Sequence, residues 1–245
     1  MDEKLRSNSL QLTRRNIGIN IVTLLSGSVA AQGMTAITLL FTARQLGAVQ
    51  YGQYVASYTL VSFAAILFSL GLDLWLLRNA GREPDQLARL TGSILAIKVC
   101  IGGIWMALFL GLAYALDSSS FPVELLRLSA LAVWLDSLFS TNLTAFRASL
   151  RNKYSAVMEA GAVGIWLSTS LLLIAGGKAQ PLAYLGVRAG ASFVGVAVST
   201  WLVWKKVHPR VSLHYIKCAL REALPFAGSD LLAMAAMRQD VLIIA

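Results

Sequence analysis

The feature that most constrains this chain is a succession of apolar runs, each long enough to cross a lipid bilayer. A membrane-spanning helix needs about 20 predominantly apolar residues. Six segments meet this requirement, and a seventh apolar run begins near residue 224. The six segments are 17–42, 54–77, 90–115, 121–146, 155–175 and 181–204. The sequence therefore predicts an all-α, polytopic helical membrane protein, with six transmembrane helices and a seventh at the C-terminal end.

The composition supports a bilayer as the main partner of the chain. Hydrophobic residues make up 57% of the 245 residues and charged residues only 13%, against about 25% charged residues in an average soluble domain. The formal net charge of +9 would suggest nucleic acid binding in a soluble protein. Here the basic residues lie mostly between the apolar runs, so membrane topology explains them and no nucleic acid partner is expected.

The distribution of the basic residues predicts the orientation of the chain. When the aqueous segments are assigned alternately to the two sides, fifteen basic residues fall on the side of the N-terminus and two, Arg44 and Lys178, on the other. Because cytoplasmic loops are enriched in Lys and Arg, we expect a cytoplasmic N-terminus and a location in the cytoplasmic (inner) membrane. The predicted organisation is a cytoplasmic segment 1–16, a six-span lobe 17–204, a cytoplasmic amphipathic linker 205–222 and a seventh span 223–245.

Four basic residues lie inside predicted spans: Lys98, Arg127, Arg188 and Arg238. Each costs about 2.5–3.5 kcal/mol at the centre of a membrane on insertion scales, so each needs an explanation. At 1.5 Å per helical residue, the three arginines share one depth in the outer third of the membrane. They are candidate substrate-binding residues that line a cavity and hold a phosphate or pyrophosphate. The alternative is that each arginine extends separately to the outer headgroups.

The remaining in-span base, Lys98, has a candidate partner in Asp136. Adjacent antiparallel helices would place the two side chains close together. We expect either a structural ion pair that fixes two helices or a pair that couples transport to an ion gradient. Two other acidic residues, Asp73 and Glu159, fall near the inner ends of spans and are expected to be solvated.

Enzymatic chemistry finds little support in the sequence. It contains no H-E-x-x-H, G-x-S-x-G or Walker A sequence. Its two cysteines, Cys100 and Cys218, lie in a span and a cytoplasmic loop, and its two histidines lie in one connector. We therefore expect no catalytic residues, no metal site, no disulfide framework and no cofactor.

Two segments carry a resemblance to a known family. The turn between the first two spans is Ala43-Arg44-Gln45-Leu46-Gly47-Ala48-Val49-Gln50-Tyr51-Gly52, and the second span closes with Gly71-Leu72-Asp73 and Leu76-Leu77-Arg78. These segments resemble the N-terminal half of the polysaccharide-biosynthesis flippases, the O-antigen and exopolysaccharide transporters of the multidrug/oligosaccharidyl-lipid/polysaccharide (MOP) exporter superfamily. The segment Leu224-Pro225-Phe226-Ala227, with Asp240 before an apolar run, looks like the seventh span of that family.

The resemblance implies a fold and a function. It implies the N-terminal lobe of an alternating-access transporter whose two lobes enclose a cationic cavity, so that Arg127, Arg188 and Arg238 could face that cavity. The implied substrate is a lipid-linked oligosaccharide with a polyprenyl-pyrophosphate headgroup, for which glycosyltransferases or a polysaccharide polymerase would be further partners. Family members have twelve to fourteen spans, so the chain is expected to be a fragment, the alternative being a half-length protein that pairs with another copy or a partner. The alternatives are a drug or metabolite exporter of the same superfamily and a non-transporting scaffold for glycosyltransferases.

Overall fold

The computed structural model is helical almost throughout and describes residues 2–65, 69, 71–115, 122–177, 180–223 and 228. No strand occurs within these ranges, so the predicted all-α class is confirmed. The helices are α1 (Asp2–Ala64), α3 (Leu72–Arg82), the short 3₁₀ helix η1 (Pro84–Gln86), α4 (Leu87–Ala115), α5 (Val123–Ala148), α6 (Asn152–Ala175), α7 (Pro181–Val207) and α8 (Leu213–Glu222).

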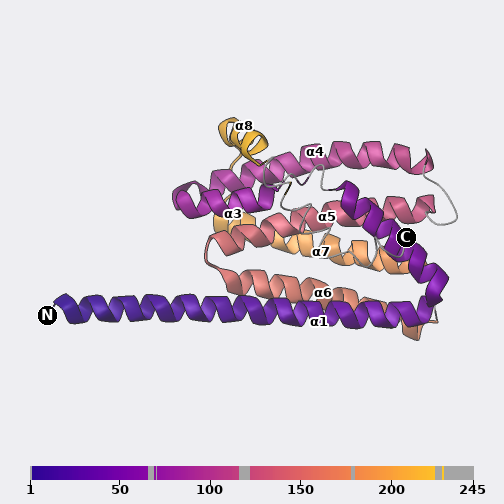
Figure 1. Cartoon of the computed structure of the whole chain (residues 1–245), viewed down its shortest axis with the longest axis horizontal. Coiled ribbons are helices and arrows are strands. Elements are labelled where there is room, and N and C mark those ends of the chain that lie inside the picture. Colours follow the sequence, from indigo (N-terminus) through magenta and orange to yellow (C-terminus); the bar gives the residue numbers. More distant parts are fainter. Residues whose placement is uncertain are drawn as a thin grey trace.

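The first two predicted spans belong to one kinked helix, α1, which reverses direction at Gly47. Figure 1 shows the long first part of α1 along one edge of the bundle and the second part returning from the turn. Gly47 has φ 73° and ψ 173° and is not helical, a conformation that side chains with a Cβ rarely adopt. No neighbouring atom lies within 4 Å of the position that a Cβ would occupy. Backbone conformation, and not packing, therefore requires glycine at this turn.

The second predicted span is not one continuous helix. Helix α1 ends at Ala64 and α3 begins at Leu72, after Gly71 with φ 65° and ψ 18°. The prediction of an uninterrupted helix over 54–77 is therefore wrong. Its apolar composition continues across the break, whereas the left-handed conformation at Gly71 ends helical geometry. The break places Asp73 in the first turn of α3.

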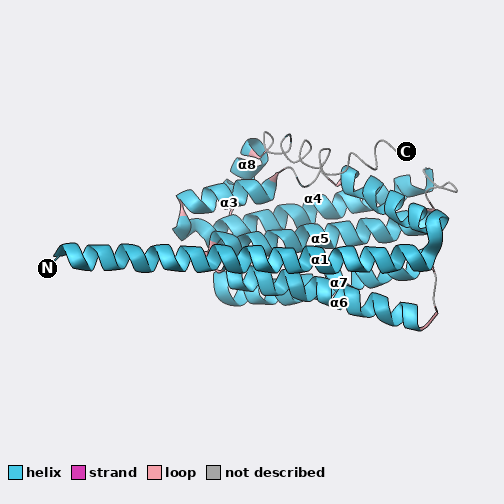
Figure 2. Cartoon of the chain, turned by 60° about the horizontal axis from the view of Figure 1, so that its bottom comes forward, coloured by secondary structure: helices cyan, strands magenta, loops and turns pink. Residues whose placement is uncertain are grey.

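Helix α5 lies inside the bundle, where it packs against α1, α3, α4, α6 and α7. Figures 1 and 2 show α1 running alongside α6. These two helices approach closely because neither carries bulk at the crossing: a Cβ on Gly27 would lie 2.5 Å from the Cβ of Ala156. Small residues at such crossings are typical of membrane helices.

Four helical stretches of the described residues are long and apolar enough to cross a membrane. They are Val22–Ala64, Pro84–Leu112, Asn152–Ala175 and Pro181–Val207. Helix α5 is not among them, and it carries Glu124, Arg127, Asp136 and Arg147. The membrane character of the chain is thus supported, while the count of six spans and a seventh stays a prediction. The predicted seventh span, 223–245, lies outside the described residues except for Ala223 and Gly228.

The segments that carry most of the basic residues gather at one end of the bundle. Figure 1 shows the N-terminal part of α1, the α3–α4 junction, the α5–α6 turn and α8 at this end. This is the grouping that the charge pattern predicts. That this end faces the cytoplasm remains a prediction.

The predicted linker 205–222 packs against the bundle from Arg210 onward. The N–H of Arg210 donates to the carbonyl of Ala88 (2.9 Å), and the backbone of Ser212 exchanges hydrogen bonds with the hydroxyl of Ser93. Helix α8 then buries Ala219 against α3 and α4. The linker therefore contacts the helical bundle.

Candidate functional site

A polar cavity of about 360 Å³ lies between α1, α5, α6 and α7. Small residues leave space at its walls, among them Ala162 on α6 and Ala191 on α7. The full lining is Thr35, Asp136, Phe139, Ser140, Leu143, Arg147, Glu159, Ala162, Val163, Trp166, Arg188, Ala191 and Ser192. Since this cavity contains four charged side chains within an otherwise apolar bundle, it is the candidate functional site.

Arg188 on α7 is held by both aromatic and polar contacts. Its guanidinium carbon lies 4.3 Å from the ring centroid of Tyr58 and 4.6 Å from that of Trp166. Its Nη2 donates to the hydroxyl of Tyr58 (2.7 Å) and to Oδ2 of Asp136 (3.1 Å). Its Nε is buried and has no hydrogen-bond partner among the described residues. The aromatic contacts fix the plane of the guanidinium, and one donor is left unused.

Asp136 on α5 is the anion that Arg188 contacts. Its Oδ2 also accepts a hydrogen bond from the hydroxyl of Tyr58 (2.8 Å), and its Oδ1 accepts one from Ser192. The side chains of Arg188 and Asp136 are 22% and 33% exposed, and both line the cavity. This ion pair can therefore be reached from the cavity.

A second ion pair lines the same cavity. Nη2 of Arg147 on α5 donates to Oε2 of Glu159 on α6 (2.9 Å), and its Nε donates to the hydroxyl of Ser155 (3.0 Å). Ser28 on α1 donates to the same Glu159 oxygen (3.4 Å). The described cavity thus has two cations and two carboxylates. The resemblance implied a cationic cavity, and the described lining carries carboxylates as well.

The structure separates two of the predicted cavity arginines. Arg127 lies in a different pocket of about 440 Å³, lined by α4, α5 and α7, over the ring of Tyr114 (4.2 Å) and 3.6 Å from Glu124. The prediction that Arg127 shares a cavity with Arg188 is therefore wrong. Arg127 precedes Asp136 by nine residues, which is two and a half helical turns, so the two side chains leave α5 on opposite faces. Arg238 lies outside the described residues.

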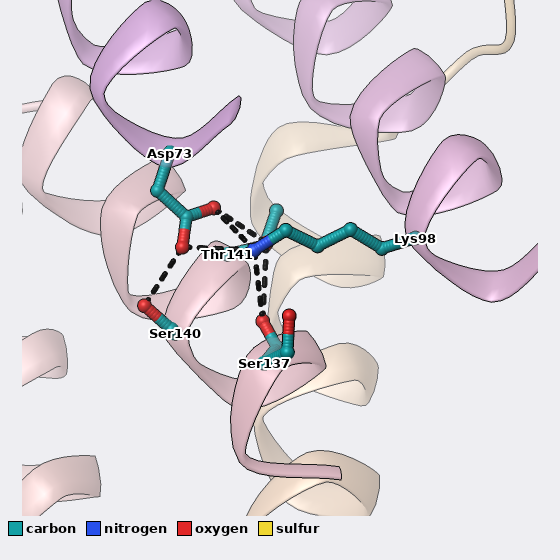
Figure 3. Close-up of polar contacts among 5 residues, drawn as sticks. All are labelled: Asp73, Lys98, Ser137, Ser140 and Thr141. Carbon is teal, nitrogen blue, oxygen red and sulfur yellow. Dashed lines mark hydrogen bonds and ion pairs between the residues drawn. The ribbon is translucent and has the colours of Figure 1, made fainter. Parts of the chain in front are cut away.

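Lys98 does not pair with Asp136, so that prediction is also wrong. Its Nζ lies 2.9 Å from both carboxylate oxygens of Asp73 and 3.2 Å from the carbonyl oxygen of Ser137. Figure 3 shows Asp73 also accepting hydrogen bonds from Ser140 (2.8 Å) and Thr141 (2.7 Å). The start of α3 after Gly71 brings Asp73 to α4 and α5, while Asp136 contacts α1 and α7 instead.

Several residues of the site were not predicted. Tyr58 and Trp166, which hold Arg188, belong to apolar runs in which an aromatic residue gives no sign of function. Asp73 and Glu159 were expected to be solvated but are ion-paired. The signal for Asp73 was available: a carboxylate two residues after a glycine in an apolar run suggests a helix break with a buried partner. Among the described residues, no group of His, Cys, Asp and Glu could hold a metal ion.

The fold and the family define the class of protein. Apolar helices surround a cavity that is lined by ion pairs. The model of the family described as polysaccharide biosynthesis protein matches residues 17–245. The chain therefore belongs to the polysaccharide biosynthesis protein family, as the turn at 43–52 suggested.

Two solved structures are similar to the chain. One is a MOP superfamily transporter from Pyrococcus furiosus, for which a reverse polarity of the binding pocket suggests a different function, with a TM-score of 0.68. The other is a multidrug resistance transporter of the MATE family in its outward-facing conformation, with a TM-score of 0.66. Both are 14% identical over 89% of this chain and share its fold. The chain spans 53% of their length. No curated protein matches it.

Proposed function

We propose that the chain contributes to the transport of a lipid-linked oligosaccharide across the cytoplasmic membrane by alternating access, for the synthesis of a cell-surface polysaccharide. The observation that carries the proposal is Arg188, a guanidinium held in a fixed plane at a cavity within an apolar bundle. The family to which the chain belongs supports the polysaccharide context.

The chemistry of the substrate fits such an arginine. A polyprenyl-pyrophosphate headgroup carries several anionic oxygens, and a planar guanidinium binds two of them through parallel hydrogen bonds. The isoprenoid tail remains in the bilayer while the charged headgroup enters the cavity. No bond is made or broken, so the protein needs hydrogen-bond donors, charge and a change of access, but no catalytic residue. Arg238, on the predicted seventh span, would supply a further cation.

The test is the flipping of a fluorescent polyprenyl-pyrophosphate saccharide in proteoliposomes that contain the purified protein. Loss of a charge-assisted hydrogen bond costs about 1.5–3 kcal/mol, so Arg188→Gln is expected to lower the rate by about 10- to 100-fold. The matched control is Arg44→Gln, which removes an exposed charge at the turn between the first two runs. Equal rates for Arg188→Gln and the wild-type protein would reject the proposal.

A second candidate function is the export of a cationic drug or metabolite. The observation that favours it is the presence of two carboxylates, Asp136 and Glu159, in the same cavity, and one structural neighbour is a multidrug resistance transporter. Carboxylates bind cations through the same charge-assisted contacts. In the same vesicles, accumulation of an organic cation that is abolished by Glu159→Gln but unaffected by Arg188→Gln would favour this function.

A further inference from the structure

We propose that the carboxylate of Asp136 competes with the substrate for the guanidinium of Arg188. A phosphate group of the substrate must displace this carboxylate before it can bind Arg188. The inference rests on the proposed function, because it takes Arg188 as a phosphate ligand. It adds a residue that sets affinity and selectivity at that site. It also explains how a cavity with balanced charges can bind an anion.

The first argument is the position of the Asp136 carboxylate. It takes one hydrogen bond from Nη2 of Arg188 and one from the hydroxyl of Tyr58. The Arg188 donor is one that an incoming phosphate would also meet, since Arg188 and Asp136 both line the cavity. The carboxylate is thus an anion that is already bound to Arg188. Its own side chain tethers it to α5.

The second argument is that Arg188 does not depend on Asp136 for its position. The rings of Tyr58 and Trp166 lie against its guanidinium, and the hydroxyl of Tyr58 accepts a hydrogen bond from it. Its Nε donor is unused among the described residues. The guanidinium therefore stays in place when the carboxylate leaves.

The third argument is that Asp136 can leave. Its side chain is 33% exposed, and apart from Arg188 and Tyr58 the described structure records one further donor, Ser192. The carboxylate of Asp73, in contrast, accepts four hydrogen bonds from three side chains. A rotation of the Asp136 side chain into the cavity breaks three hydrogen bonds, and the phosphate replaces the one to Arg188.

A tethered competitor changes selectivity as well as affinity. The apparent Kd of an anion equals its intrinsic Kd divided by the fraction of molecules in which Arg188 is free. A monovalent carboxylate gains little binding free energy when it replaces the carboxylate of Asp136 at Arg188. A pyrophosphate, with more charge and more oxygen acceptors, gains more from the same guanidinium. Asp136 therefore keeps small monovalent anions off the site, and its neutralisation is expected to lower the preference for pyrophosphate over acetate.

The experiment measures the binding of inorganic pyrophosphate to the purified protein in nanodiscs of neutral phosphatidylcholine, by titration calorimetry. Asp136→Asn is expected to tighten binding by about tenfold, since it raises the fraction of free Arg188 and keeps the size of the side chain. Glu124→Gln is the matched control, because Glu124 is an ion-paired carboxylate of the same helix that is 65% exposed and does not line the cavity. It is expected to change the Kd by less than about threefold.

Two further variants keep the test decisive. Ser192→Ala removes only the hydrogen bond to Oδ1 of Asp136, so it tightens binding by a few fold and serves if Asp136→Asn does not fold. Arg188→Gln is expected to abolish binding. If Arg188→Gln binds as the wild type does, the proposed function fails. If Arg188→Gln abolishes binding but Asp136→Asn and Ser192→Ala do not tighten it, or Glu124→Gln tightens it equally, only the competitor is rejected.

Discussion

Two ion-pair clusters lie side by side on α5, and they differ in what surrounds them. The Lys98–Asp73 pair joins α3, α4 and α5, and the lysine side chain is 1% exposed. The Arg188–Asp136 pair joins α5 and α7 beside the open cavity, with one arginine donor unused among the described residues. The ammonium of Lys98 is thus enclosed, although its partner Asp73 is 23% exposed, whereas both members of the Arg188–Asp136 pair line the cavity. The difference teaches that access, and not the ion pair itself, separates a structural role from a binding role.

The enclosed cluster should carry more of the stability. Removing one partner of a buried ion pair leaves an uncompensated charge, which costs about 3–5 kcal/mol. At the cavity the same change leaves a charge that water or an anion can reach. We therefore expect substitutions in the Lys98–Asp73 cluster to act mainly on folding and substitutions at Arg188 to act mainly on binding.

The largest expected effect belongs to Asp73→Asn. It leaves the ammonium of Lys98 without its counter-ion in the interior, so the free energy of unfolding should fall by about 3–5 kcal/mol. Denaturant unfolding in mixed micelles measures it. Asp85→Asn, at an exposed carboxylate in η1, is the control and should change stability by less than about 0.5 kcal/mol.

The double variant Asp73→Asn/Lys98→Met removes both charges and tests the cause of that loss. Replacement of a buried ion pair by uncharged residues of similar volume is often neutral or stabilising, so most of the lost stability should return. A double variant as unstable as Asp73→Asn alone would show that packing around α3, and not the unpaired ammonium, explains the loss.

The next effect concerns the frame of the cavity. A side chain at Gly27 would push α1 away from Ala156 on α6, and the adjacent Ser28 donates to Glu159. Gly27→Val should therefore cost about 1–3 kcal/mol of unfolding free energy and weaken pyrophosphate binding. Gly33→Val is the matched control, since the same helix has open space at Gly33. Equal losses in the two variants would mean that helix propensity, and not the crossing, is responsible.

A smaller and more local effect is expected near the enclosed cluster, at Gly92 of α4. A Cβ there would lie 2.5 Å from the carbonyl oxygen of Arg210, so Gly92→Ala should detach the segment around Arg210 without opening the bundle. Cys218 on α8 should then react faster with a soluble maleimide. Gly111→Ala is the control, because the same helix has open space at Gly111. In this variant the rate at which Cys218 reacts with the maleimide should stay unchanged. Unchanged labelling in Gly92→Ala would show that the segment is held elsewhere.

The sequence predicted the helices better than the relations between them. Apolar runs and the alternation of charge identified the helical class and the segments that gather at one end of the bundle. Depth along a helix also follows from the sequence, because each residue adds 1.5 Å. The partners of a charge do not, since they depend on rotation about the helix axis and on which helices are neighbours. Lys98 was therefore assigned to Asp136, although the break after Gly71 brings Asp73 to it.

The same limit explains the cavity. Arg188 was found because a guanidinium inside a predicted membrane span is unusual. The rings of Tyr58 and Trp166 and the carboxylates of Asp136 and Glu159 come from three other helices, and only packing shows that they meet. A sequence can indicate that an intramembrane charge needs a partner, but the compensating residue is chosen by the tertiary structure.

The smallest effect is expected at Arg127, and it tests the separation of the two arginines directly. Arg127 and Arg188 share a predicted depth, but the structure places Arg127 in a pocket with Leu110 and Leu182, over Tyr114. Its ion pair with Glu124 is long and 65% exposed on the carboxylate side, which is worth about 0–1 kcal/mol. Arg127→Gln should therefore change pyrophosphate binding by less than about twofold, as titration calorimetry would show.

A loss of binding in Arg127→Gln as large as that in Arg188→Gln would contradict this separation. It would mean that the two guanidiniums act on one anion, as equal depth alone predicts, and that α5 turns its Arg127 face toward the cavity during transport. Unchanged binding would instead assign anion recognition to the face of α5 that carries Asp136. In that case half a turn of α5 separates Arg127 from Asp136, the partner of Arg188, and that rotation keeps Arg127 away from the substrate.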